Sequence, residues 1–243
     1  MAKIPHTIPI DWFGNRNEYE QSDIRIVTVG LNPSDIEFKE SDKDSICSTK
    51  YRFPSAKVGV PATYPQAWNE YFTCNPYDWF NNFERVLQGA GASFGGQSPE
   101  GIGEHDHDHP HRRAIHTDLC SSEATLPTWS QLSHAEKRAI AQVGIPRWEE
   151  QMKQLQPDII IMSVAKEYWS QLPITDISDL YVITEAKDGS KRKRPVVIRK
   201  GYYNGALVIL GVTRNTPFGS VCKEEQKHIG ELILQAFNKM KGK

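Results

Sequence analysis

The chain lacks most of the features that mark membrane, secreted and globally basic proteins. No run of about 18 apolar residues occurs in its 243 residues, which argues against a membrane-spanning helix. Residues 1–6 contain no apolar signal core, so we expect a cytoplasmic protein. The formal net charge is only −1, which excludes a globally basic surface and leaves only local patches for contact with nucleic acid.

Cysteine is scarce and dispersed. The four cysteines, Cys47, Cys74, Cys120 and Cys222, form no Cys-x-x-Cys pair, which indicates a reduced setting without a cysteine cluster. No repeat of 20–50 residues is present, which excludes a repeat architecture. The length suffices for one substantial core, so we expect a single domain over residues 1–243 and a monomer.

The chain does contain apolar strand patterns that alternate with helical patterns. Strands are predicted near residues 24–30, 114–119, 159–162 and 206–211, and helices within 65–88, 131–155, 164–172 and 222–237. This alternation is typical of an α/β protein, and we expect a three-layer α/β/α fold with a mostly parallel central sheet. Residues 181–198 predict an inserted β-hairpin with its turn at 187–190. Pro146 predicts a break in the helix over 131–155.

Polar side chains follow three of the predicted strands. Asn32 follows the first, within Gly30-Leu31-Asn32-Pro33-Ser34; Thr117 and Asp118 end the second; Arg214 and Thr216 follow the last. The carboxyl ends of parallel strands share one edge of a sheet, where open α/β sheets bind their ligands. We therefore expect these groups to converge on one crevice. The long loop 35–63 before the first helix is also expected to be functional.

The first motif resembles that of the uracil-DNA glycosylase superfamily. Its sequence is closest to the mismatch-specific and single-strand-selective branches, which read Gly-x-Asn-Pro-Gly. Arg214-Asn215-Thr216-Pro217-Phe218 falls where the second motif of the family, His-Pro-Ser-Pro-Leu, would lie. Thr117-Asp118-Leu119 falls where the family carries its pyrimidine-reading Asn.

The resemblance implies a DNA glycosylase of base excision repair that flips a base into a pocket and needs no cofactor. Its DNA would be double-stranded, single-stranded or mismatched. In this reading Asn32 holds the attacking water, Asp118 faces the polar edge of the base, and Arg214 stabilises the departing base. The implied binding residues are Gly30, Leu31, Pro33, Ser34, Phe53 as the stacking platform, Thr117, Thr216, and Phe218 as the wedge.

Two departures from the family leave the substrate open. An Arg replaces the His of the second motif, and an Asp replaces the Asn that reads uracil. An ionised Asp accepts hydrogen bonds but donates none, so Asp118 would repel a uracil carbonyl and suit an exocyclic amine. Either the substrate is not uracil, or Asp118 is protonated, or Asp118 activates the water while Asn32 reads the base.

Two other functions compete with the glycosylase. His105, His107, His109 and His111 alternate with two Asp residues, a composition suited to a metal-dependent hydrolase, although a solvated loop is the preferred interpretation of this run. A non-catalytic nucleic-acid or nucleotide-binding relative is the other alternative. The basic run Lys191–Arg194 at the hairpin tip is a candidate for phosphate contacts.

Overall fold

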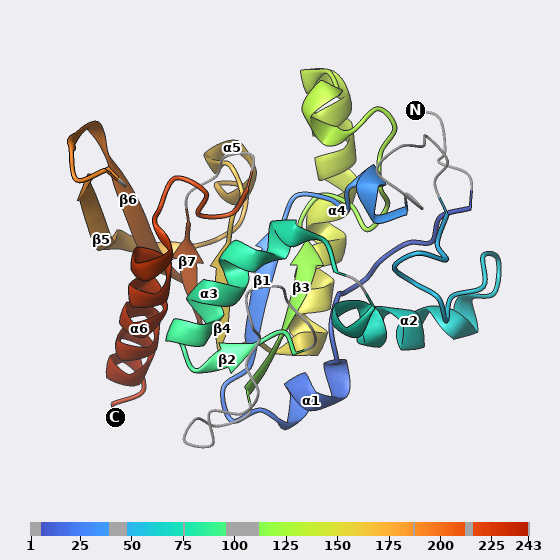
Figure 1. Ribbon diagram of the computed structural model, residues 1–243, viewed down its shortest axis with the longest axis horizontal. Helices are drawn as coiled ribbons and strands as arrows, with labels where there is room; N and C mark the ends of the chain where they lie inside the picture. The colour runs from blue at the N-terminus through green and yellow to red at the C-terminus, as the bar shows by residue number, and fades with distance from the viewer. Residues whose placement is uncertain are drawn as a thin grey trace.

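The computed structural model describes residues 6–38, 48–74, 76–95, 112–186, 188–211 and 216–242 (Figure 1). Within these residues the strands form one seven-stranded sheet in the order β2-β3-β1-β4-β7-β6-β5. The strands are β1 (Ile26–Gly30), β2 (Ala92–Ser93), β3 (Arg112–Asp118), β4 (Ile159–Met162), β5 (Thr175–Glu185), β6 (Lys191–Tyr203) and β7 (Ala206–Leu210). The predicted α/β class with a mostly parallel sheet is confirmed, since four of the six described strand pairings are parallel and the β5–β6 and β6–β7 pairings are antiparallel.

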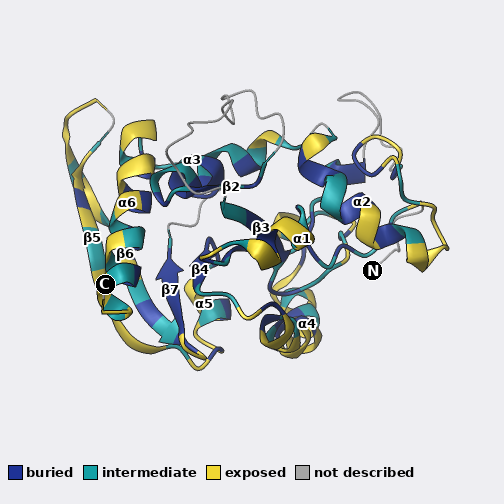
Figure 2. Ribbon diagram, turned by 90° about the horizontal axis from the view of Figure 1, so that it is seen from below, coloured by how far each residue is buried: buried dark blue, intermediate teal, exposed yellow. Residues whose placement is uncertain are grey.

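Helices cover both faces of the sheet. They are α1 (Arg16–Gln21), α2 (Tyr64–Glu70), α3 (Asn81–Gly89), α4 (His134–Leu155), α5 (Lys166–Trp169) and α6 (Lys223–Met240). Short 3-10 helices are η1 (Asp35–Phe38), η2 (Pro61–Thr63), η3 (Tyr71–Thr73), η4 (Asp78–Phe80) and η5 (Trp129–Gln131). Figure 2 shows α3 and α6 on one side of the sheet and α4 and α5 on the other. No helix in the described ranges is long and apolar enough to cross a membrane.

Strand β1 lies inside the sheet, between β3 and β4, and is buried along its whole length. It pairs in parallel with β3 on one side, where Ile26 is opposite Ala114, and with β4 on the other, where Ile26 is opposite Ile159. The chain therefore leaves β1 toward one edge of the sheet and later crosses to its other side. Such a switch point opens a crevice at the carboxyl ends of the strands.

The antiparallel part of the sheet is larger than the sequence predicts. Strands β5 and β6 extend well beyond the segments predicted on either side of the turn, and β6 also pairs with β7. Arg199 of β6 is opposite Leu210, the last residue of β7. Residues 191–198 of β6 therefore project past the carboxyl ends of the parallel strands.

Helix α4 begins as the sequence predicts but does not break at Pro146. Ser133 and Glu136 form the reciprocal capping box that their spacing indicates. The predicted break is wrong, because the helix runs without interruption to Leu155. Its second half buries Trp148 and Met152 against the sheet, and this packing offsets the hydrogen bond that proline removes.

Candidate active site

A cavity of about 400 Å³ lies at the carboxyl ends of β1, β3 and β4, where the switch in strand order predicts a crevice. Its size is within the range of small-ligand sites. Asn32, Glu37, His116, Asp118, Ser34 and Ser163 supply polar side chains to its lining. Phe13, Tyr77, Trp79, Phe80 and Trp129 supply aromatic ones. The predicted residues Leu31 and Pro33 also line it.

Asn32 is held by its amide nitrogen. Its Nδ2 donates to the backbone oxygen of Pro33 at 2.9 Å and more weakly to Oγ1 of Thr125 at 3.4 Å. The turn itself is fixed, because Leu119 and Cys120 donate backbone hydrogen bonds to the oxygens of Gly30 and Leu31. This arrangement leaves the carboxamide oxygen of Asn32 as the acceptor with which the side chain can orient a water molecule.

Successive side chains of β3 point to opposite faces of the sheet, so Asp118 and Thr117 lie on different faces. Thr117 is buried and its Oγ1 accepts a hydrogen bond from Nε1 of Trp148 in α4 at 3.0 Å. It therefore faces the side of the sheet opposite the cavity and is not among the lining residues. His116, two residues before Asp118, points the same way as Asp118 and lines the cavity. The period of two in a strand was the sequence signal that could have identified His116.

His116 is fixed by contacts on every side. Its Nδ1 lies 2.8 Å from Oγ1 of Thr28 on β1, and its ring packs edge-on against Phe80 and Trp79 at centroid distances of 5.0 and 5.5 Å. Its Nε2 lies 3.6 Å from Oδ1 of Asp118. A Cβ at Gly30 would lie 2.6 Å from that same Asp118 oxygen, so only glycine lets both groups pack over the end of β1.

The carboxylate of Asp118 receives no hydrogen bond from the residues that the structure describes. Its side chain is 4% exposed, and among the described residues its one polar contact is the 3.6 Å approach of His116 Nε2, which is too long for a hydrogen bond. Because Asp118 lines the cavity, its oxygens can accept hydrogen bonds from a molecule bound there. This geometry suits a ligand that brings its own donors or a positive charge.

Glu37 is a second carboxyl group of the cavity that sequence reasoning missed. It lies on η1, inside the loop that was expected to be functional, and is 3% exposed. Its Oε2 accepts a hydrogen bond of 2.6 Å from Tyr71 and lies 3.5 Å from Nε of Arg52. Burial raises the pKa of Glu37 to about 7, an effect that Arg52 and Tyr71 oppose and that the charge of Asp118 reinforces.

Two aromatic residues that the sequence predicts at the site lie away from the cavity. Phe53 is fully buried, packs against Phe38 and Tyr71, and does not line the cavity. Phe218 is also fully buried, against Phe83, whereas a wedge must be exposed to enter a duplex. Thr216 is half-buried and does not line the cavity. The rings that do line it are Phe13, from the segment before α1, and rings from the segments around η4 and η5.

Several predicted residues lie outside the described ranges. Arg214, Asn215 and the run of His105, His107, His109 and His111 are among them. Within the described ranges no group of three or more His, Cys, Asp or Glu side chains could hold a metal ion.

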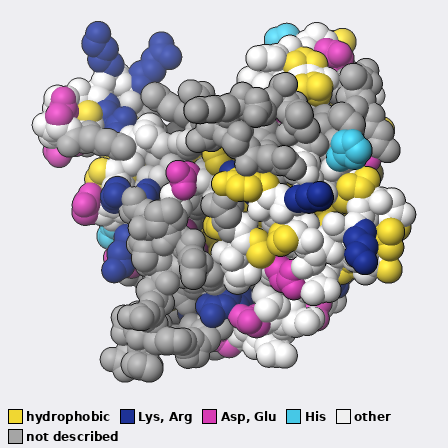
Figure 3. All heavy atoms as spheres, turned by 45° about the vertical axis from the view of Figure 1, so that its right-hand side comes forward, with side chains coloured by type: hydrophobic (Ala, Val, Ile, Leu, Met, Phe, Trp, Pro, Cys, Tyr) yellow, Lys and Arg dark blue, Asp and Glu magenta, His cyan; other side chains and the backbone are white. Residues whose placement is uncertain are grey.

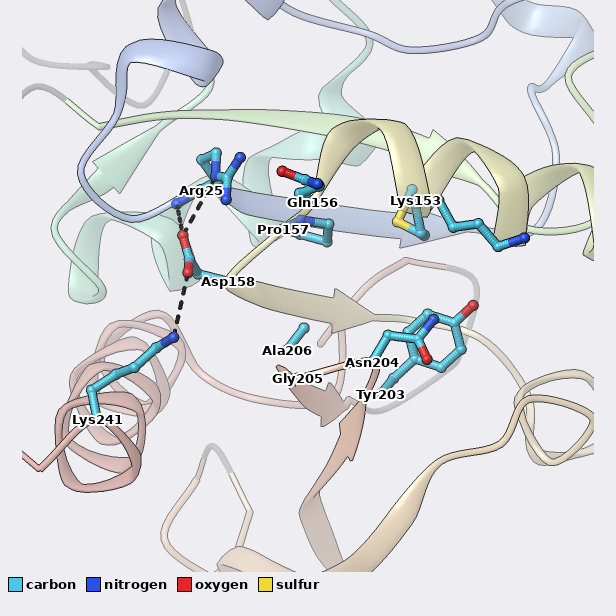
Figure 4. Close-up of a pocket in the computed structure, with 11 residues that line it drawn as sticks. Arg25, Lys153, Gln156, Pro157, Asp158, Tyr203, Asn204, Gly205, Ala206 and Lys241 are labelled. Carbon is cyan, nitrogen blue, oxygen red and sulfur yellow. Dashed lines mark hydrogen bonds and ion pairs between the residues drawn. The ribbon is translucent and has the colours of Figure 1, made fainter.

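A second cavity, of about 550 Å³, lies at the opposite edge of the sheet (Figure 4). The carboxylate of Asp158 in this cavity is already paired. It accepts a hydrogen bond from the backbone nitrogen of Arg25 at 3.0 Å, and it lies 3.6 Å from Nε of Arg25 and 3.8 Å from Nζ of Lys241. The cavity faces the amino ends of the strands, which is not where parallel sheets bind ligands. We therefore place the functional site at the first cavity.

No protein-family model matches the chain, and no curated protein matches it by sequence.

Proposed function

We propose that the protein is a DNA glycosylase-like hydrolase that cleaves the N-glycosidic bond of a modified base flipped into the cavity. The observation that carries the proposal is that Asn32 and Asp118, predicted from two separate strand ends, line one cavity at the switch point of the sheet. Aromatic rings in the same lining offer stacking surfaces to a base, and each such contact is typically worth about 1–3 kcal/mol.

The chemistry requires an oriented water and a group that takes its proton. Bond cleavage leaves positive charge on the sugar, which the water oxygen then attacks. The carboxamide oxygen of Asn32 can orient this water, as its nitrogen is already engaged. Glu37, whose pKa is raised to about 7, is suited to accept a proton at neutral pH. Asp118 would face the polar edge of the base, whereas Arg214 lies outside the described residues and has no role in this proposal.

The position of the basic hairpin tip supports DNA as the partner. Lys191, Lys193 and Arg194 are exposed, and the register of β6 carries them past the edge of the sheet that holds the cavity. Figure 3 shows Lys and Arg side chains projecting from this end of the molecule. Arg192 joins the tip to the segment after β7 by donating to the backbone oxygen of Ser220. The tip would contact phosphates and guide the strand to the cavity.

The test is base release from single- and double-stranded oligonucleotides that each carry one altered base. Wild-type protein is expected to leave alkali-labile abasic sites, and Asn32→Ala to slow their formation by at least about 100-fold, the effect typical of a lost oriented group. Gln154→Ala, which removes a carboxamide from the exposed face of α4, is the matched control and should leave the rate unchanged.

Absence of abasic sites on every substrate, with DNA binding retained, would support the alternative of a non-catalytic nucleic-acid-binding protein. The replacement of the second-motif His by Arg214 is the observation that favours this alternative. Binding would then weaken with salt and would not depend on Asn32.

A further inference from the structure

We propose that the cavity selects a base that carries a positive charge, of the kind formed by alkylation of a ring nitrogen in a purine that keeps its exocyclic amine. The proposal rests on the glycosylase function and narrows its substrate class. It follows from the charge, the hydrogen-bonding capacity and the aromatic lining of the cavity.

The charge of the described lining residues favours a cation. Two carboxyl groups, Glu37 and Asp118, line it, and none of the described lining residues is Lys or Arg. Arg52 pairs with Glu37 from behind, at 3.5 Å, so the carboxylate left without a donor is that of Asp118. A cationic base would supply the charge and the N–H donors that this buried carboxylate lacks.

The aromatic lining points to the same ligand. Tyr77, Trp79 and Trp129 are each half-buried, so part of each side chain stays accessible. The electron-rich face of such a ring attracts a cation, most strongly when the ring belongs to Trp. A flat cationic base gains both stacking and cation–π attraction from these rings, whereas a neutral base gains stacking alone.

Deaminated bases fit the cavity less well. Deamination replaces an exocyclic amine with a carbonyl, and the carbonyl oxygen would face the acceptor oxygens of Asp118. A neutral base that departs as an anion would also develop its negative charge between two carboxyl groups. Alkylation at a ring nitrogen keeps the amine and adds positive charge. The amine can then donate a hydrogen bond to Asp118, and the positive charge attracts its carboxylate.

A cationic base also simplifies the reaction. The bond between the sugar C1′ and the base nitrogen breaks, and its electron pair neutralises the ring, so the base leaves without needing a proton. Water adds to C1′ through its oxygen and loses one proton, which the carboxylate of Glu37 accepts. The cation and water thus yield a neutral base, an abasic sugar and one proton, and no acid is required to assist the leaving group.

The experiment compares oligonucleotides that carry N7-methylguanine, uracil, hypoxanthine or unmodified guanine at one position. Free base is quantified under single-turnover conditions, and spontaneous loss without protein is subtracted. We expect N7-methylguanine to be released at least about tenfold faster than uracil or hypoxanthine. A factor of this size corresponds to one favourable interaction of the cation with a carboxylate or an aromatic ring. Asp118→Asn should reduce this preference, and Asp179→Asn on the exposed surface of β5 is the matched control.

Each outcome separates this inference from the proposed function. Faster or equal release of uracil or hypoxanthine would overturn the cationic substrate while leaving a glycosylase in place. No release from any oligonucleotide would refute the glycosylase. In that case the affinity for 1-methyladenosine, a cation at neutral pH, is compared with the affinity for neutral adenosine, and the comparison shows whether the cavity prefers a cation. Tighter binding of the cation by at least about tenfold, lost in Asp118→Asn, supports the inference, and equal binding overturns it.

Discussion

At the scale of single residues, the site depends on side chains that pack at the end of β1. Gly30 is the point of closest approach, because Asp118 and His116 both lie against the position that a Cβ would occupy. The sequence marked this glycine as part of a motif, and the structure gives its physical reason. The strand partners set this constraint, since the backbone conformation of Gly30 is ordinary.

Gly30→Ala should therefore damage the site more than the fold. The added methyl would displace Asp118 and His116 and is expected to lower unfolding free energy by about 1–3 kcal/mol, as overpacking typically does. Base release should fall by at least about tenfold. Urea denaturation measures the unfolding free energy, and single-turnover assays measure the rate of base release. Wild-type values of both in Gly30→Ala would show that the site has room for a Cβ at this position.

Glu37 should make stability depend on pH. Its pKa rises from 4.5 to about 7 on folding because burial disfavours its charge, against the opposing effects of Arg52 and Tyr71 and with the added effect of Asp118. The folded protein therefore binds more proton than the unfolded chain between about pH 4.5 and about pH 7. Stability from this group is fully present below that window and is lost as the pH rises through it, by about 3 kcal/mol.

Glu37→Gln cannot titrate and should remove this slope. Urea unfolding of both proteins at several pH values between about 4.5 and about 8 measures it, and the gap in stability between variant and wild type should change across the window. Glu150→Gln, at an exposed position paired with Lys153, is the control. Parallel curves for Glu37→Gln and wild type would contradict the raised pKa.

The sequence was enough to locate the residues that follow the parallel strands, because the carboxyl ends of these strands lie along one edge of the sheet. It placed Asn32 and Asp118 correctly at one cavity. It could not assign Phe53 or Phe218, since an aromatic residue in a loop packs inward or outward depending on tertiary contacts that no local pattern encodes. Glu37 was missed for the same reason, as its burial comes from Tyr71 and Arg52, which lie far along the chain.

At the scale of elements, α3 and α6 pack through glycines. A Cβ at Gly89 would lie 1.9 Å from the backbone oxygen of Lys227, and one at Gly230 would lie 2.0 Å from that of Val86. The two helix backbones therefore touch, and together they cover one face of the sheet beside the site (Figure 2). Helical periodicity predicted both helices but gave no indication of which residues form their contact.

Gly230→Ala should force these helices apart. Backbone atoms cannot move aside as flexible side chains do, so we expect a loss of at least about 3 kcal/mol despite the better helix propensity of alanine. Thermal or urea denaturation measures the loss. Gln235→Ala on the exposed side of α6 is the matched control and should change stability by no more than about 0.5 kcal/mol. A Gly230→Ala protein as stable as the control would contradict the close contact.

The β5–β6 hairpin should contribute to DNA affinity through its charge. Replacing both Lys193 and Arg194 with Glu is expected to weaken binding to any DNA sequence and to reduce the salt dependence of log K by about 2, one for each lost phosphate contact. Fluorescence anisotropy across a salt series measures both. The double variant Lys153→Glu and Lys239→Glu places the same charge change on exposed positions at the opposite edge of the sheet and should have a smaller effect.

At the scale of the whole molecule, one core connects the sheet and its helices. Buried side chains from β1, β3, β4, β7 and from α3, α4 and α6 belong to a single cluster. We therefore expect one cooperative unfolding transition, in which tryptophan fluorescence and far-ultraviolet circular dichroism coincide along a urea series. Two separated transitions would show that part of the chain unfolds as an independent unit.

The borders of the sheet have a consequence for association between molecules. One border is β2, which offers only two residues for pairing. The other is β5, whose register with β6 shifts at three places and whose residues include Asp176, Asp179 and Glu185. An irregular, acidic border is a poor template for an incoming strand. We therefore expect the described borders of the sheet to disfavour strand pairing between molecules, and light scattering at high protein concentration would measure this.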